Sequence, residues 1–181
     1  MMAWSIAALL LLLPLVAMQF TDEVNWTVSD FVFAMLLILS VGLPLELAVS
    51  RTGSLAYRAA VGLVLIVWFL TLWLNGAVGI IGSEDNSANV MYAGVIAIAI
   101  IGAVIARFRP GGMARAMIGA ALALVAIAAI VLVTGWGSEE PVWPWPVVII
   151  NGFMAALLVA AAMLFRYAAQ ENARAGTLPV R

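Results

Sequence analysis

The sequence lacks three residue types that carry much of protein chemistry: histidine, cysteine and lysine are all absent from its 181 residues. Without histidine or cysteine there are no usual haem, iron–sulfur or zinc ligands. Without lysine no Schiff base can hold retinal or pyridoxal phosphate. Serine–histidine and cysteine–histidine catalytic pairs are also excluded. We therefore expect no such cofactor, and a bound metal must be a hard cation such as Ca²⁺ or Mg²⁺ held by oxygen ligands.

Charge is the next scarce feature. Charged residues supply 9% of the chain and hydrophobic residues 66%, with a mean hydropathy of +1.18. A soluble domain has about 25% charged and about 45–50% apolar residues. The sequence therefore predicts an all-α fold, a polytopic transmembrane helical bundle in contact with the lipid bilayer. With a formal net charge of −1, we expect no nucleic-acid partner.

The apolar runs predict about six spans in a single transmembrane domain over residues 1–167. The polar residues 168–181 predict a cytoplasmic tail that begins as a helical extension. The first run could also be a signal peptide, but its start has no basic residue and Val16-Ala17-Met18 is a poor cleavage site, which favours a retained span. The expected spans are 3–20, 28–50, 57–82, 89–108, 113–136 and 147–167.

The charges alternate between the connections of these spans. All eight arginines lie in or beside the hairpins after the second and fourth spans, or in or beside the tail. All acids except Glu46 and Glu171 lie in or beside the other three connections. Because basic residues are retained in the cytoplasm, this pattern predicts that both termini are cytoplasmic and that the acidic loops face outward.

The outward loops are rich in oxygen ligands. One interpretation is a hard-cation site that attracts a cation or cationic solute. The other is that short translocated loops are simply polar, with Asn86 capping the fourth helix and the acids in solvent. No segment matches an EF-hand loop. The candidate ligands are Asp22, Glu23, Asp30, Glu84, Asp85 and Asn86.

Three polar residues fall inside apolar runs, where an unpaired polar group is costly. Asn75 lies about two turns inside the third span, and Asn151 lies in the sixth, where interhelical hydrogen bonding is the simplest role. Glu46 lies near the inner boundary. It could couple transport to proton movement, or it could pair with an arginine such as Arg51, Arg58 or Arg107 and anchor the helix end.

Small residues line the last three spans, including Gly94, Gly102, Gly119 and Gly152. Such faces let helices pack closely, either within one chain or against a second copy or another membrane protein. The segment Pro141-Val142-Trp143-Pro144-Trp145-Pro146 predicts a stiff interfacial anchor, or alternatively a docking edge.

Three phrases resemble those of a group of small, uncharacterised bacterial multi-pass inner-membrane proteins: Thr21-Asp22-Glu23-Val24-Asn25-Trp26, Gly79-Ile80-Ile81-Gly82-Ser83-Glu84-Asp85-Asn86 and Ala106-Arg107-Phe108-Arg109-Pro110. The resemblance implies location and span count but no activity. From the residues we expect a protein that binds or transports a small solute or cation through an outward acidic, asparagine-rich site. The alternative is an accessory or assembly subunit of a larger membrane complex. We do not expect an enzyme, because no catalytic constellation is visible.

Overall fold

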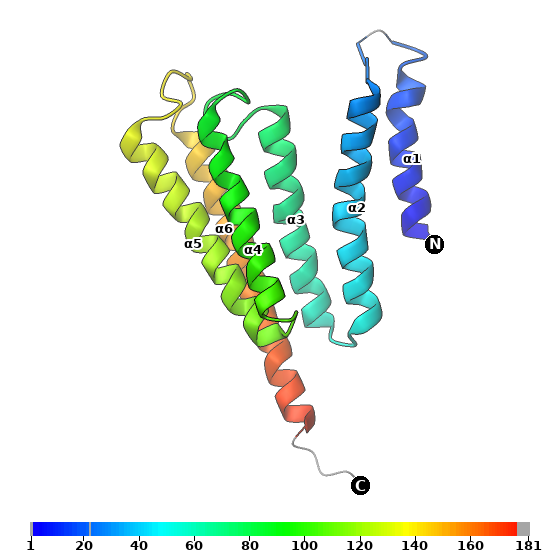
Figure 1. Cartoon of the computed structure of the whole chain (residues 1–181), viewed down its shortest axis with the longest axis vertical. Coiled ribbons are helices and arrows are strands. Elements are labelled where there is room, and N and C mark those ends of the chain that lie inside the picture. Colours follow the sequence, from blue (N-terminus) through cyan, green and yellow to red (C-terminus); the bar gives the residue numbers. More distant parts are fainter. Residues whose placement is uncertain (1, 22, 177–181) are drawn as a thin grey trace. The chain divides into compact units, whose positions relative to one another are not determined.

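The computed structural model describes residues 2–21 and 23–176, which form helices, turns and loops (Figure 1). The predicted all-α class is confirmed. Among the described residues, five helices are long and apolar enough to cross a membrane, and the first helix holds a shorter apolar stretch, Ala8–Ala17. This agrees with a bundle of about six spans. The chain forms two compact units, Met1–Leu47 and Ala48–Arg181, which are described separately. Whether they act as the single domain expected from the sequence stays a prediction.

The first unit is a helical hairpin. Helix α1 spans Met2–Ala17 and contains Pro14, and α2 spans Val28–Arg51 and continues into the start of the second unit. The start of α2 carries part of a capping box. Asp30 Oδ2 accepts hydrogen bonds from the Thr27 backbone N–H at 2.7 Å and from the Thr27 hydroxyl at 2.8 Å. This reciprocal bond fixes the point where the helix begins.

The second unit contains α3 (Leu55–Ala77), the short 3₁₀-helix η1 (Ser87–Val90), α4 (Met91–Ile105), α5 (Pro110–Thr134) and α6 (Trp145–Gly176). Helix α6 packs against both α3 and α5, and α4 packs against α5 (Figure 1). A continuous apolar core runs through these four helices. Small residues allow the closest approach, because a Cβ added at Gly102 would lie 2.5 Å from the Ala116 Cβ.

One helix ends earlier than the expected span, and another continues beyond it. We expected the third span to reach residue 82, but α3 ends at Ala77. Gly79 and Gly82 take φ values of +70° and +68°, a left-handed conformation that glycine adopts without strain and that stops a helix. At the other end of the chain, α6 continues to Gly176, so the predicted helical extension of the tail is confirmed as far as it is described.

Candidate functional site

The acidic candidates of the first unit serve local structure where they are described. Asp22 lies outside the described residues. Glu23 is exposed, and its backbone N–H donates to the Thr21 hydroxyl oxygen at 3.1 Å. Asp30 caps α2 through Thr27. One Asp30 oxygen is therefore used by the helix start.

Glu46 has a partner that the sequence analysis did not anticipate. Its Oε2 accepts a hydrogen bond from the Trp4 indole Nε1 at 2.7 Å. The indole lies over Gly42, one turn earlier on α2, where an added Cβ would lie 2.9 Å from Trp4 Cη2. Glycine at this position gives the ring room, and the carboxylate four residues later receives its N–H. Glu46 thus joins α1 to α2 near the end of the hairpin that contains the N-terminus.

We expected Arg51, Arg58 or Arg107 as a possible partner of Glu46, and the structure describes other surroundings for two of them. Arg58 donates from Nε to the Thr52 carbonyl and from Nη2 to the Val49 carbonyl, both at 2.8 Å. These carbonyls belong to the C-terminal turn of α2 and the residue after it, so Arg58 caps that helix. Arg107 lies in the turn between α4 and α5, and the side chain of Arg51 lies outside the described residues.

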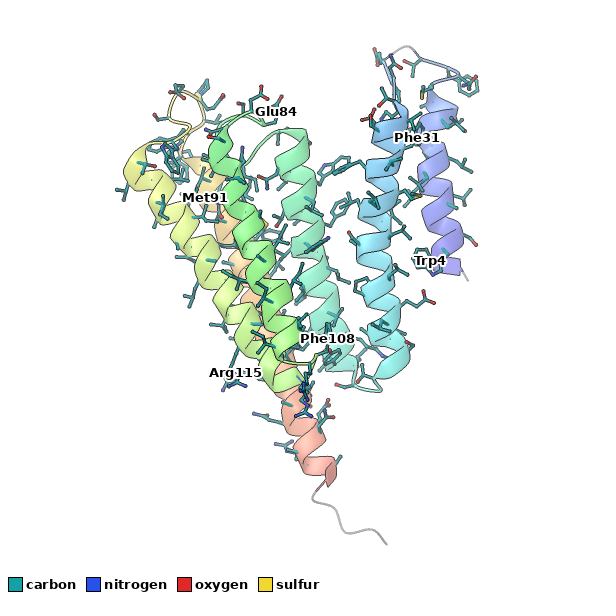
Figure 2. The ribbon with its side chains drawn as sticks, viewed as in Figure 1. Trp4, Phe31, Glu84, Met91, Phe108 and Arg115 are labelled. Carbon is teal, nitrogen blue, oxygen red and sulfur yellow. The ribbon has the colours of Figure 1, made fainter. Side chains whose placement is uncertain are left out.

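The acidic end of the second unit, formed by the loops at 78–86 and 135–144, carries the other predicted ligands. Glu84, labelled in Figure 2, and Asp85 are exposed there. Asn86 caps η1, because its Oδ1 accepts from the Ala88 N–H at 3.0 Å. Within the described residues, no group of three or more acidic side chains lies close enough together to hold a metal ion. The hard-cation site stays a prediction.

The Asn89 side chain holds the loop after α3 in place at the acidic end of the unit. Its Oδ1 accepts from the backbone N–H groups of Ile80 at 3.1 Å and Ile81 at 3.0 Å. Its Nδ2 donates to the Ser83 carbonyl at 2.8 Å. The two isoleucine side chains are buried in the core, at 2% and 0% exposure. We call residues 79–82 the plug, because this apolar turn closes the acidic end of the bundle over its core.

The plug also contacts the other loop at the acidic end. A Cβ added at Gly137 would lie 2.8 Å from the Gly82 backbone nitrogen. Gly137 has a φ of +79°, and Gly135, with a φ of +71°, ends α5 in a left-handed C-cap. The two loops can approach this closely only because glycine faces glycine. The acidic residues of both loops are therefore collected at the same end of the unit.

Asn151 is the most deeply buried polar side chain beneath the plug, with 1% exposure. Its Nδ2 donates to the Val147 carbonyl and to the Tyr92 hydroxyl, both at 2.8 Å, and the second bond links α6 to α4. The interhelical hydrogen bond expected of Asn151 is thus present. Because a carbonyl can only accept, Nδ2 must face Val147 and the amide cannot be flipped. Its Oδ1 is buried and has no hydrogen-bond partner among the described residues.

Asn75 repeats this arrangement on α3. Its Nδ2 donates to the Thr71 carbonyl at 2.7 Å, which again fixes the amide orientation, and its Oδ1 is buried without a partner in the described part of the chain. The Thr71 hydroxyl lies 3.5 Å from the Met154 sulfur, where α3 meets α6. The sequence did not indicate this contact.

The register of α3 and α6 places the two asparagines at the same depth. The helices are antiparallel, and Thr71 and Met154 mark one level of contact. Asn75 lies four residues later on α3 and Asn151 three residues earlier on α6, so each is about one turn closer to the acidic end and on the same helix face as its marker. Two buried acceptor oxygens are therefore brought to one level. Thr134, near the end of α5, is exposed, and its hydroxyl donates to the Ile130 carbonyl at 2.9 Å.

Comparison of the chain with protein-family models, with curated proteins and with solved structures finds no match. The fold and composition define a multi-pass helical membrane protein. A function must therefore be argued from the buried polar groups and the charged ends of this chain.

Proposed function

We propose that the protein binds or transports a small cationic solute with N–H donors, such as a primary ammonium group, between α3 and α6 beneath the plug. The observation that carries the proposal is the pair of buried Oδ1 atoms on Asn75 and Asn151. A buried carbonyl without a donor is costly, and few such groups occur in a folded protein. A ligand that donates hydrogen bonds would satisfy both.

The charges at the acidic end support a cation over a neutral solute. Its loops carry the exposed residues Glu84, Asp85, Glu139 and Glu140 and, in the described residues, no base. A surface of one sign raises the local concentration of the opposite ion and speeds its arrival. The plug above the asparagines would have to open for a ligand to enter. The resemblance to small bacterial membrane proteins supports a bacterial inner membrane as the location.

Thermal unfolding of the purified chain with two matched probes tests the proposal. Methylammonium carries N–H donors, whereas tetramethylammonium has the same charge and none. We expect methylammonium to raise the unfolding temperature and tetramethylammonium to have little effect. A ligand at about 100 times its Kd stabilises a protein by about 2.7 kcal/mol.

Two variants and a control locate the site. Asn75→Leu and Asn151→Leu each remove one acceptor oxygen at similar side-chain size, and we expect both to lose most of the methylammonium shift. Thr134→Val removes an exposed polar group from α5 and should keep the shift. The readout is the shift on adding the probe, so a variant that is less stable still reports binding.

A wild-type chain that neither probe stabilises would contradict the proposal. Buried water would then account for the hydrogen bonding of the two oxygens. A shift that survives both leucine substitutions would also contradict it. Recovery of one stoichiometric protein partner by crosslinking in an unresponsive chain would favour the accessory-subunit alternative instead.

A further inference from the structure

The turn between α4 and α5 has an unusual backbone at the arginine end of the second unit, opposite the acidic end. Arg107 and Phe108 have φ values of +50° and +57°, and left-handed backbone is uncommon in residues other than glycine. The Phe108 N–H donates to the Ala103 carbonyl at 3.1 Å, and the Phe108 carbonyl accepts from the Tyr57 hydroxyl at 2.9 Å. The Tyr57 ring packs edge-on against buried Phe165, with centroids 5.1 Å apart. The turn is therefore held in place by the core.

The fixed turn presents an aromatic ring between two cations. Phe108, labelled in Figure 2, is 58% exposed although it is large and apolar. Arg107 and Arg109 on either side of it are also exposed. At the end of a membrane helix, an exposed ring lies at the boundary between headgroups and acyl chains, and flanking arginines lie at the level of the phosphates.

These arginines lack acidic partners within the described part of the chain. No described carboxylate forms an ion pair with Arg107 or Arg109. Glu171, the acid at this end of the unit, accepts from the Ser54 hydroxyl at 2.8 Å. Arg58, by contrast, is used to cap the end of α2. The fold thus positions the two turn arginines, and no described acidic side chain supplies their counter-charge.

We propose that Arg107, Phe108 and Arg109 form a binding site for the headgroup of an anionic phospholipid. Guanidinium groups bind phosphate oxygens in a bidentate manner, and each arginine near an anionic membrane surface adds to the attraction. The ring inserts beside the first acyl carbons. An anionic lipid is favoured over a zwitterionic one, because the turn offers no acid to a choline or ethanolamine ammonium group. This site lies at the opposite end of the unit from the asparagines and does not depend on the function proposed for them.

Lipid titration of the full chain in nanodiscs tests this site. Phosphatidylcholine discs receive rising fractions of phosphatidylglycerol, and the unfolding temperature and the lipids retained in native mass spectrometry are measured. We expect preferential retention of phosphatidylglycerol and an increase in stability that saturates. Arg107→Gln with Arg109→Gln should weaken phosphatidylglycerol binding by about tenfold or more. Inorganic phosphate in phosphatidylcholine discs is the separate arm for a soluble anion.

A charge-matched control separates a site from general attraction. Arg166→Gln with Arg174→Gln removes the same charge from α6 and leaves the turn intact, so it should keep most of the binding. Phe108→Ser tests the ring without changing charge and should lower phosphatidylglycerol retention. Equal loss in both double variants would overturn the proposal, and so would no preference for phosphatidylglycerol in the wild type. Saturation by inorganic phosphate alone would likewise overturn a lipid site.

Discussion

Removing the side chain of Asn89, a residue of η1, should loosen the plug. Asn89→Ala deletes the acceptor of the Ile80 and Ile81 N–H groups and the donor to Ser83. The two isoleucine side chains stay buried, at 2% and 0% exposure, so their N–H groups lose a partner while their surroundings remain apolar. The variant therefore isolates the hydrogen bonds from the packing.

The size of the effect follows from these two N–H groups. A buried donor left without a partner costs about 1–3 kcal/mol. Water can reach part of this loop, since Asn89 is only half-buried, so we expect a total of about 2–4 kcal/mol. At about 1.4 kcal/mol per tenfold change, the plug should open about 30-fold more often or more. Burial of the two isoleucines, worth about 1.5–3 kcal/mol each, keeps the plug closed on average.

Because the chain contains no cysteine, opening of the plug can be followed by labelling a single introduced thiol. A single Ile81→Cys substitution creates one thiol in the chain, buried when the plug is closed, and its labelling by a maleimide reports opening. Ser83→Cys is the exposed reference for reagent reactivity. Asn86→Ala is the matched control, because Asn86 makes one capping bond, to Ala88, in the same loop. We expect Asn89→Ala to accelerate labelling about 30-fold and the control to change it only a few-fold.

Two outcomes would refute this account of the plug. Labelling at the same rate with and without Asn89→Ala would mean that Asn89 does not hold the turn. An equal acceleration by Asn86→Ala would mean that the whole loop opens as one unit, without a special role for Asn89.

Two further changes test the structure around the site. Gly79→Ala should lower the free energy of unfolding by about 2 kcal/mol or more, because φ is +70° and the added Cβ would overlap the Ser83 carbonyl. Gly62→Ala in α3 is the control and should not destabilise the protein, because its added Cβ meets nothing within 4 Å. Chemical unfolding of the two variants in one detergent compares these free energies. Tyr92→Phe removes the hydroxyl that accepts from Asn151 and should lower the free energy of unfolding by about 1–2 kcal/mol in the same assay. An unchanged free energy of unfolding would show that this hydrogen bond between α4 and α6 contributes nothing to stability.

The sequence predicted the helical spans well because lipid imposes one strong rule, that the backbone must satisfy its own hydrogen bonds. The length of the apolar run was therefore enough to place α2. The end of α3 was wrong because Ile80 and Ile81 are as apolar as the helix before them. Only the backbone conformation of Gly79 and Gly82, which hydropathy does not encode, separates the plug from the span.

The partners of the buried polar residues were harder to predict. Asn151 and Tyr92 are 59 positions apart, and Glu46 and Trp4 are 42 apart. Each pair meets only once the helices have packed, and several side chains could have met the same need. A tryptophan near one end of an apolar run and a glycine four residues before a lone acid are signals that, taken together, would have suggested the contact of Trp4 with Glu46.

The central claim is that the Oδ1 atoms of Asn75 and Asn151 receive hydrogen bonds from a small cation. Its most direct test is ¹³C NMR of the side-chain carbonyl carbons of asparagine-labelled protein, titrated with methylammonium and, separately, with tetramethylammonium. We predict that the Asn75 and Asn151 signals shift and saturate with methylammonium only, while those of Asn25 and Asn86 stay in place. Signals of Asn75 and Asn151 that remain fixed throughout the methylammonium titration would contradict the claim.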